Sequence, residues 1–368
     1  MNAHRQKLIL LPPNRVWRPY PGGRTLEQLA GAPQPADSFL SEEWIGSTTR
    51  AVSRGREAPA EGLSQVRVGH DPALRDFATL LASDPEYFLG AAHVKKFGAQ
   101  PQVLVKFLDS GTRLYLQVHP TREFALRFLG APSGKTEAYY VLDVRDPASA
   151  PEPVGYVFVG FQRPPTPAAL REFIVTQNIA ALEACFDPIA VRPGDILIIP
   201  GGTPHALGAG VFMVEIQEPS DLVVRFEFER AGYVLPEASR FMGRDLDFAL
   251  TVFNFAPLTL CDVDARIRCQ PRRLRVLGPG SWQDELIGAA QTDCFRVTRT
   301  HLGGPVLKDE TSFVIAIVTA GAVMVEAGGE SHRFNTYDKL FFPAGLGPVK
   351  LTPVTATAEI LECRPPAA

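Results

Sequence analysis

The sequence predicts a mainly β protein whose strands form barrels or sandwiches of the jelly-roll type. Short apolar or alternating segments recur between turn signals, which is typical of strands. Glycine and proline are abundant, with 31 and 33 residues, as expected of a chain with many tight turns. One strand-and-turn pattern also occurs twice. Many short strands at turn-bounded spacing favour a jelly roll.

Seven strands are expected before residue 230. They cover residues 103–109, 114–120, 136–144, 154–161, 195–200, 211–217 and 223–229. The first two, VLVKFLD and LYLQVHP, are separated by Ser110-Gly111, which predicts a hairpin between them.

Helices are expected at four places. Three aspartate-proline or threonine-proline pairs, beginning at Asp71, Asp84 and Thr166, look like an N-cap residue followed by proline at the first helical position. The helices that they open are expected over residues 72–82, 85–97 and 167–186, and a fourth helix over 245–255.

Further strands are expected over residues 295–302, 312–321, 322–329 and 339–345, and this part of the chain echoes an earlier one. RPGDILIIPGGTPHAL (192–207) and NTYDKLFFPAGLGPVKL (335–351) each contain an acidic residue, an apolar strand ending in proline, and a glycine turn. Pro348 stands about where His205 does in the first copy. The simplest account is two β-barrels, of which only the first carries polar ligands.

Composition narrows the class of protein. A chain of 368 residues predicts two or three domains, and 45% hydrophobic with 21% charged residues is typical of a globular protein. A net charge of -3 gives no support to nucleic-acid binding. No apolar run approaches membrane-helix length and the start lacks a signal-peptide core, so we expect a cytoplasmic protein. The oligomeric state is not indicated.

The stretch LYLQVHP points to a metal site. Gln117 and His119 are two apart, so both side chains leave the same face of a strand. A satisfied buried histidine is the simpler interpretation. The other is half of a metal site, with Glu137 of GKTEAYY and His205 of PGGTPHAL as partners. Two imidazoles, a carboxylate and an amide oxygen suit Zn²⁺ or another divalent first-row ion. The five cysteines are scattered without a CxxC pair, so thiolate ligands are not expected.

These motifs, taken in order, resemble a known family. TRLYLQVHPTREFA, GKTEAYYVL and PGDILIIPGGTPHALGAGVFMVEIQEPSDLVVRFEF are similar to the cupin-type (type I) mannose-6-phosphate isomerases. Upstream, SEEWIGS (41–47) resembles the family's E-x-W segment, and VLVKFLDS its lysine-bearing strand. The echo after residue 270 is like the degenerate second cupin that many members carry.

The resemblance implies a mainly β fold of two cupin-type jelly-roll barrels, with a few helices inserted in and between them. We expect a catalytic cupin domain with helical insertions over residues 1–235, a helical linker over 236–270, and a degenerate, metal-free cupin domain over 271–368. Metal bound near His301 or His332 would contradict the last expectation.

The resemblance also implies an activity and a ligand set. It implies interconversion of mannose 6-phosphate and fructose 6-phosphate through a metal-stabilised enediol, with a sugar phosphate as the partner molecule. One Zn²⁺ per chain, or another divalent first-row ion, would be bound by four residues: Gln117, His119, Glu137 and His205. The matching catalytic-site positions are Lys106, Lys135, Asp221 and Arg225.

Moving a proton between adjacent carbons requires a base with a pKa near neutrality. Lys135 is one candidate if a metal charge lowers its pKa, Glu215 on the strand after His205 is another, and Asp221 is a third. The residues alone leave this choice open. Arg225 suits an enediolate or a phosphate, because its planar guanidinium makes paired hydrogen bonds.

Three departures bear on substrate recognition. Tyr115 replaces a family serine linked to the phosphate end of the substrate, Thr121 replaces an aspartate, and FEFER follows where a tyrosine-aspartate pair is common. We therefore keep two alternatives to the mannose 6-phosphate activity. One is a cupin isomerase or epimerase for a different sugar, phosphorylated or not. The other is a non-catalytic cupin that binds sugar.

Overall fold

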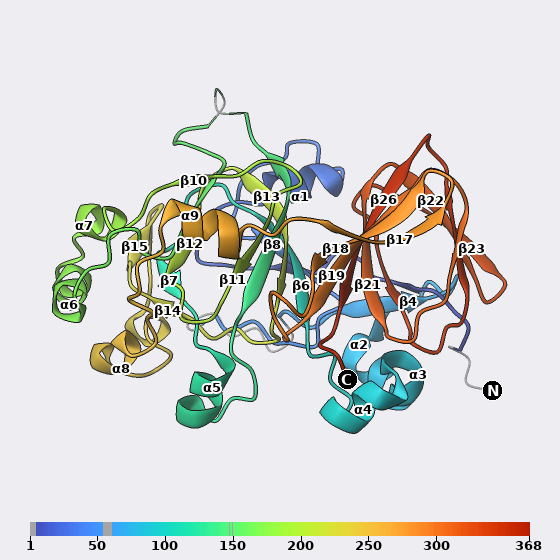
Figure 1. The fold of residues 1–368 in the computed structure, drawn as a ribbon, viewed down its shortest axis with the longest axis horizontal. Helices are drawn as coiled ribbons and strands as arrows, with labels where there is room; N and C mark the ends of the chain where they lie inside the picture. The colour runs from blue at the N-terminus through green and yellow to red at the C-terminus, as the bar shows by residue number, and fades with distance from the viewer. Residues whose placement is uncertain (1–4, 54–60, 147, 149) are drawn as a thin grey trace.

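The computed structural model describes residues 5–53, 61–146, 148 and 150–368, and its regular structure is mainly antiparallel strand. Sheets follow one another along the long axis of the molecule (Figure 1). In the described residues a five-stranded sheet lies at one end and a six-stranded sheet in the middle. A nine-stranded sheet and a four-stranded sheet lie at the other end. The prediction of a mainly β fold is confirmed.

The six-stranded and five-stranded sheets are built from residues 15–225. The six-stranded sheet consists, in order, of β11 (Ile196–Ile199), β8 (Glu137–Val144), β13 (Val211–Gln217), β6 (Leu104–Asp109), β3 (Glu42–Ile45) and β2 (Arg15–Val16). The five-stranded sheet consists of β10 (Ile189–Ala190), β9 (Tyr156–Val159), β12 (His205–Leu207), β7 (Gln117–Val118) and β14 (Val224–Arg225).

The other sheets belong mostly to the last hundred residues. The nine-stranded sheet consists, in order, of β17 (Arg272–Gly278), β18 (Ser281–Ile287), β19 (Arg296–Leu302), β26 (Ala358–Arg364), β21 (Val314–Ala320), β24 (Lys339–Phe342), β1 (Ile9–Leu10), β4 (Gln65–Val68) and β5 (Arg75–Asp76). The four-stranded sheet consists of β20 (Val306–Lys308), β25 (Val349–Pro353), β22 (Ala322–Ala327) and β23 (Glu330–Asn335). A small hairpin joins β15 (Glu229–Arg230) to β16 (Tyr233–Val234).

The six-stranded sheet is buried on both faces, which explains why its strands read as almost continuous apolar runs. One face, with Phe107 and Tyr140, packs against Phe341 and other residues of the nine-stranded sheet. The opposite face, with Tyr139 and Met213, packs toward the five-stranded sheet. Successive strand residues alternate between the faces, so each strand contributes to both cores. Strand β1, near the N-terminus, pairs with β24 and so adds an N-terminal segment to the nine-stranded sheet.

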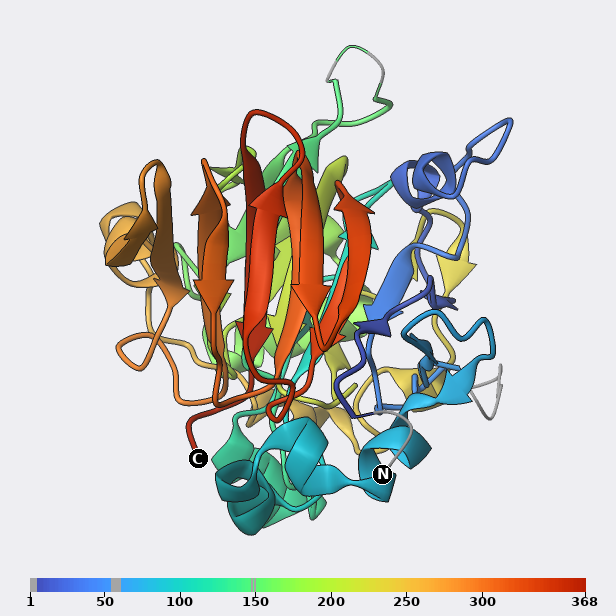
Figure 2. The same cartoon turned by 90° about the vertical axis from the view of Figure 1, so that its right-hand side faces the viewer.

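The helices lie outside these layers. They are α1 (Arg24–Leu29), α2 (Phe77–Ser83), α3 (Pro85–Leu89), α4 (Ala91–Phe97), α5 (Arg122–Phe124), α6 (Pro167–Thr176), α7 (Ile179–Glu183), α8 (Leu246–Leu250) and α9 (Leu260–Asp262), with a 3₁₀ turn over Glu237–Ser239 and π-helical turns over Ala125–Leu129 and Val263–Ile267. Figure 2 shows α2 to α4, in cyan, below the edge of the nine-stranded sheet. Within the described residues, none of these helices is long and apolar enough to cross a membrane.

Two of the three predicted helix starts are confirmed. Thr166 accepts a hydrogen bond from the Ala169 amide, and a helix begins at Pro167. A helix also begins at Pro85, although the Asp84 side chain pairs with Arg5 and does not cap it. The start at Asp71 is wrong. Residues 75–76 instead form β5, and α2 begins only after Asp76, whose side chain accepts from Thr79.

The predicted hairpin at Ser110-Gly111 is also wrong. Strand β6 pairs with β13 and β3, whereas β7 pairs with β12 and β14 in the five-stranded sheet. Ser110 explains the separation, because its hydroxyl bonds to the backbone of Gly208 and Val211 and holds the turn against another segment. The connection therefore crosses from one sheet to the facing sheet.

Candidate active site

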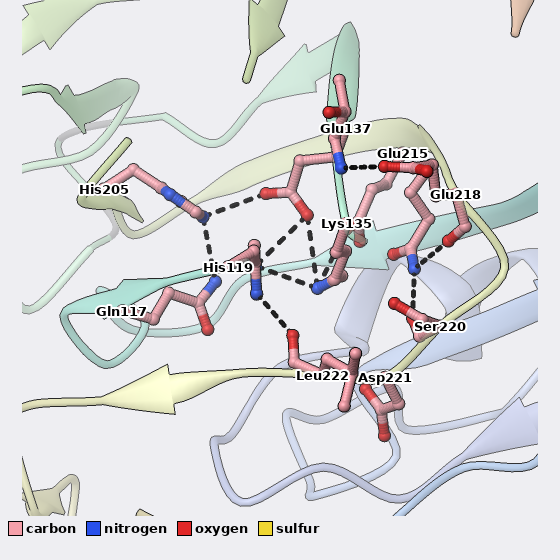
Figure 3. A network of polar contacts seen from close by, with 12 residues as sticks. Gln117, His119, Lys135, Glu137, His205, Glu215, Glu218, Ser220, Asp221 and Leu222 are labelled. Carbon is pink, nitrogen blue, oxygen red and sulfur yellow. Dashed lines mark hydrogen bonds and ion pairs between the residues drawn. The ribbon is translucent and has the colours of Figure 1, made fainter. Parts of the chain in front are cut away.

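The predicted polar residues meet between the six-stranded and five-stranded sheets. Strands β6, β8 and β13 supply Lys106, Glu137 and Glu215. On β13, Glu215 is aligned with Lys106 of β6 and Gln217 is aligned with Glu137 of β8, so the three side chains come from neighbouring positions of one sheet. From the facing sheet, Gln117 on β7 is aligned with both His205 on β12 and Arg225 on β14. Residues far apart in the sequence are thus brought to one place by strand register (Figure 3).

Two imidazoles and one carboxylate form the centre of this cluster. His205 Nε2 lies 2.9 Å from Glu137 Oε1, and His119 Nε2 lies 3.4 Å from Glu137 Oε2. The three ligand atoms lie within 4.8 Å of one another, and each of the three side chains is only 1% exposed. Glu137 Oε2 is in ion-pair contact with His119 and Lys135 and has no further hydrogen-bond partner in the described part of the chain.

Backbone carbonyls fix the orientation of both imidazoles. Nδ1 of His119 lies 2.8 Å from the Leu222 carbonyl oxygen, and Nδ1 of His205 lies 2.8 Å from the Thr203 carbonyl oxygen. Each Nδ1 donates there, which leaves the Nε2 lone pair directed at the cluster. This is the arrangement by which outer hydrogen bonds orient metal-binding histidines.

The Gln117 amide completes the set of four predicted ligands. Its nitrogen lies 3.2 Å from His205 Nε2. A half-turn of the amide about its last rotatable bond would present Oε1 instead, which is the acceptor atom of this group.

The Lys135 ammonium stands among these ligands. Its Nζ lies 3.0 Å from His119 Nε2, 3.2 Å from Glu137 Oε2 and 3.8 Å from Glu215 Oε1. A cation is therefore already accommodated between the imidazole and the carboxylates.

Burial and the neighbouring Lys135 charge lower the pKa of His119 to about 3. Burial opposes ionisation of Glu137, but Lys135 and the two histidines outweigh it and hold the pKa of that carboxyl well below its usual value. A neutral imidazole and an ionised carboxylate are the forms that bind metals, so the residues present fit a divalent ion.

Glu215 has a different electrostatic environment. Burial raises the pKa of this carboxyl to about 7, against the opposing effect of Lys106 and Lys135. Lys106 Nζ lies 3.3 Å from Glu215 Oε2 and 3.7 Å from Glu42 Oε2, and its side chain is 1% exposed. Burial disfavours the Lys106 charge, but these two carboxylates outweigh it and raise the pKa.

Asp221 is fully engaged. Its two carboxylate oxygens accept hydrogen bonds from Arg18 at 2.9 and 3.0 Å, and the Val52 amide donates to it at 2.8 Å. Burial raises the pKa of Asp221, but the Arg18 charge and hydrogen bonds outweigh it and leave the pKa far below its usual value.

Arg225 is the opposite case. It is 7% exposed, and its Nη1 donates a hydrogen bond to the Ser239 carbonyl oxygen at 3.2 Å. Burial, reinforced by the nearby Arg18 charge, lowers its pKa. Among the described residues no carboxylate lies within ion-pair distance of this guanidinium.

Two cavities adjoin Arg225. An inner one of about 20 Å³ is lined by Arg225 together with Arg18, Tyr20, Gln117, Lys135 and Glu215, among others. An outer one of about 280 Å³ is lined by Arg225 with Asp221, Val52, Ser239 and Met242, among others. Of the charged side chains that line the outer cavity, only Arg225 also lines the inner one.

Tyr115, the residue at the family's serine position, lies apart from this group. It is 1% exposed within the apolar core, and its hydroxyl donates to the Tyr233 carbonyl at 2.7 Å. It does not line either cavity.

The sequence did not reveal several polar residues of the site. Glu42 accepts hydrogen bonds from Tyr20 and from Trp44 Nε1, and Tyr139 donates to Glu137. The E-x-W segment contained Glu42 and Trp44, so a signal for these two existed. Arg18 had none, because its pairing with Asp221 joins residues 203 positions apart.

No protein-family model matches the chain. Two proteins of Bacillus subtilis (strain 168) are similar to it in sequence. It is 25% identical to the probable mannose-6-phosphate isomerase GmuF over 335 residues, which are 90% of this chain and 91% of the relative. It is also 25% identical to mannose-6-phosphate isomerase ManA over 254 residues, 68% of this chain and 71% of the relative.

The fold is shared as well. The crystal structure of a mannose 6-phosphate isomerase from Bacillus subtilis superposes with a TM-score of 0.72 and 19% identity, covering 97% of this chain and 99% of the other. Sequence similarity over most of the chain, a common fold and the ordered motifs agree. The chain is thus similar to mannose-6-phosphate isomerases in sequence over most of its length, and it shares their fold.

Proposed function

We propose that the protein is an aldose-ketose isomerase that interconverts mannose 6-phosphate and fructose 6-phosphate. The observation that supports this most is the grouping of a buried His119–Glu137–His205 cluster with Glu215, whose pKa is about 7, and with Arg225. No carboxylate of the described residues lies within ion-pair distance of Arg225. Glu215 and Arg225 line the inner cavity together with Gln117 and Lys135, which connect it to the proposed metal ligands. The relatives of the chain carry the name of this activity.

The metal of this proposal is one Zn²⁺ per chain, held by Gln117, His119, Glu137 and His205. Two imidazole nitrogens, a carboxylate and an amide oxygen suit zinc among the first-row ions. When bound, it would act as a Lewis acid toward the substrate oxygens. The carbonyls of Leu222 and Thr203 keep both imidazoles directed at that position.

Glu215 is the proposed base. The open-chain aldose loses a proton from C2 and gains one at C1, while the hydroxyl proton on O2 is exchanged for one on O1, so there is no net redox change. A carboxylate whose pKa is near 7 can take and return the carbon-bound proton. Asp221 is less suitable, because Arg18 and the Val52 amide occupy its oxygens.

Lys106, Lys135 and Arg225 place positive charge around Glu215, the proposed base. Lys135 lies 3.8 Å from Glu215 and can donate to a substrate oxygen beside it. Lys106 holds Glu215 in place from the other side. Arg225 borders both cavities, where it can bind the enediolate or the phosphate of the substrate.

The proposal includes the finer fold assignment. The facing six- and five-stranded sheets would be the first cupin-type jelly-roll barrel, with residues 1–235 as the catalytic domain and 236–270 as a helical linker. The sheets of residues 271–368 would be the second barrel. Both copies of the sequence echo support this, since each forms a strand, a turn and a strand: β11 with β12, and β24 with β25.

A second candidate is an isomerase of a different sugar, phosphorylated or not. It is favoured by Tyr115, whose hydroxyl is bonded to the Tyr233 carbonyl and whose side chain lines neither cavity. A residue in that environment does not replace a phosphate-binding serine. Phosphate recognition in this chain would therefore have to come from elsewhere in the site.

The test is a coupled isomerase assay on the zinc-loaded protein, with a panel of mannose 6-phosphate, other hexose phosphates and the free hexoses. We expect turnover of mannose 6-phosphate, its loss with a chelator, and its return with zinc. Turnover of free sugars alone would favour the second candidate. Sugar binding without conversion would favour a non-catalytic protein, and turnover that resists complete metal removal would contradict the metal site.

A further inference from the structure

A second cluster of metal-ligand side chains lies at the surface, away from the candidate active site. Glu330 and His332 are two apart on β23, so both leave the same face of that strand. His70 follows the end of β4, which belongs to the N-terminal part of the chain. Figure 1 shows β4 and β23 on the same side of the molecule. The ligand atoms of the three side chains lie within 4.8 Å of one another.

Two of these ligand atoms are buried without a partner. Glu330 Oε2 and His332 Nε2 make no hydrogen bond within the part of the chain that the structure describes, and their side chains are 8% and 11% exposed. The two atoms lie 3.7 Å apart, too far for a hydrogen bond. Two donors on one tetrahedral zinc would be about 3.3 Å apart, given bonds of about 2.0 Å. Their separation is thus close to that of two ligands sharing one ion.

The neighbours of Glu330 hold its carboxylate in place while leaving Oε2 available. Lys7 Nζ lies 2.5 Å from Oε1, the other oxygen. Behind the carboxylate is Gly69, which has a φ of 57° and where a Cβ atom would lie only 2.6 to 2.8 Å from the two oxygens. Only glycine accommodates both that backbone conformation and that close contact.

The protonation states are also those of ligands. Burial opposes ionisation of Glu330, but Lys7 outweighs it and lowers the pKa of the carboxyl. Burial, together with the adjacent His70, lowers the pKa of His332. An anionic carboxylate therefore faces a neutral imidazole.

His70 provides the third donor. Its ring stacks on that of His332 with centroids 4.1 Å apart and an angle of 19° between the planes. The residue is exposed, and one of its ring nitrogens already lies within 4.8 Å of the other two ligand atoms.

We propose that His70, Glu330 and His332 bind a second divalent transition-metal ion, such as Zn²⁺, with water in the remaining position. Three protein ligands and one open position suit zinc with its mixed nitrogen and oxygen preference. The ion would join β4 to β23 and so connect the N-terminal segment to the C-terminal sheets. It would also contradict our sequence-based expectation that residues 271–368 bind no metal near His332.

The experiment is a zinc titration of the full-length, metal-stripped protein by calorimetry, with bound metal counted after dialysis. We expect two zinc ions per chain in the wild type and one in His332→Ala. Glu330→Gln should also bind one. His70→Ala removes an exposed side chain and cannot disturb the core, so it tests the site even if the other variants are destabilised. This variant should lower the affinity for the second zinc ion by at least about tenfold.

The matched control is His301→Ala. His301 belongs to the same part of the chain but pairs with Glu359 and stacks on Trp282. This variant should keep both ions, and His332→Ala should keep the isomerase turnover of the wild type. A zinc count that is the same in the wild type, His332→Ala and His70→Ala would overturn the proposal, whether or not the first site holds its ion.

Discussion

Two of the buried polar clusters in the described residues each lie between a pair of facing sheets, and they differ in the pKa values and charge pairing of their groups. The first is the candidate active site. The second lies between the nine- and four-stranded sheets around Glu362, a carboxylate that is 1% exposed. Its two oxygens receive hydrogen bonds from a set of five surrounding side chains, or lie close to them: Gln283, Thr298, Thr300, Lys308 and Arg364.

The difference supports the proposal that the first cluster is the one that carries chemistry. Lys308 and Arg364 outweigh the effect of burial and keep the pKa of Glu362 far below its usual value, so this carboxylate is a fixed charge. In the first cluster the pKa of Glu215 is about 7, and among the described residues Arg225 has no carboxylate within ion-pair distance. A buried cluster with all groups paired stabilises the fold, whereas unpaired groups and perturbed pKa values are typical of functional sites.

The largest effect is expected from removing a metal ligand. His205→Ala deletes one of two imidazoles in the first cluster, so zinc binding at that position and isomerase turnover should both fall below detection. Metal content and the coupled assay on the same preparation measure this. His93→Ala is the control, because that buried histidine bonds to the Gln100 carbonyl far from the site. Full turnover in a His205→Ala protein would show that the first cluster is not the site.

Replacing the proposed base should come next. Glu215→Gln keeps the shape of the side chain but removes the proton acceptor, so turnover should fall by about 10² to 10⁴ with zinc retained. Asp221→Asn is the comparison, and we expect it to cost less because Asp221 is already bonded to Arg18. A larger loss in Asp221→Asn or in Lys135→Met than in Glu215→Gln would assign the base to that residue instead.

Arg225→Ala should reduce turnover by roughly 10²-fold, similar to the loss of one oxyanion-binding group. The fold and the zinc content should be nearly unchanged, since Arg225 is not a proposed metal ligand and its side chain donates a hydrogen bond only to a backbone carbonyl among the described residues, that of Ser239. Arg225→Lys should recover little, because an ammonium lacks the planar fork. Arg230→Ala, which removes an arginine paired with Glu152, is the control. Wild-type turnover in Arg225→Ala would refute the proposed role.

The second cluster should respond in stability and not in turnover. Lys308→Met removes one partner of a buried ion pair and should lower the free energy of unfolding by about 3 to 5 kcal/mol. Lys350→Met breaks the exposed pair with Glu326, whose side chains are 49% and 41% exposed, and should cost less than about 1 kcal/mol. Denaturant unfolding of both variants, with the isomerase assay alongside, makes the comparison. Lost turnover in folded Lys308→Met would mean that the two clusters are coupled.

Much of the fold followed from local patterns, and the errors have physical causes. Strand 211–217 was predicted to the residue, because its apolar run is bounded by turns and pairs on both sides. The stretch LYLQVHP was expected to be a full strand, but only Gln117 and Val118 pair. Pro120 has no amide hydrogen to continue the ladder. The helix expected over 167–186 is divided at Gln177, which adopts a left-handed conformation.

The grouping of the candidate ligands could be predicted because these residues lie in short motifs. Gln117, His119, Glu137 and His205 could be named from the sequence, and the structure brings all four together. The choice of base could not be made, because the pKa of Glu215 depends on burial and on two lysines from other strands. Arg18 was missed for the same reason. Tertiary contacts, unlike motifs, leave no local pattern.

The smallest expected effect is the pH dependence of the stability of the metal-free protein. The ordinary pKa of a glutamate is 4.5, and that of Glu215 in the folded protein is about 7. Between these values the folded state binds more protons than the unfolded state, so stability decreases as pH rises through this window and levels off above it. A decrease of stability with rising pH is the direction expected for a buried carboxylate whose ionised form is disfavoured. Glu362, whose pKa is lowered, contributes in the opposite direction and at lower pH.

The measurement is the melting temperature of the chelated wild type minus that of Glu215→Gln, from pH 5.5 to 8. Above pH 5.5 the neighbouring carboxylates Glu42 and Glu137, whose pKa values are lowered, stay ionised, and His119, with a pKa of about 3, stays neutral. Their effects therefore largely cancel in the difference. We expect the difference to fall by a few degrees with rising pH, since each unit of pKa shift is worth about 1.4 kcal/mol. A flat or rising difference would mean that Glu215 is ionised throughout, as Glu362 is, and would remove the main electrostatic distinction between the two clusters.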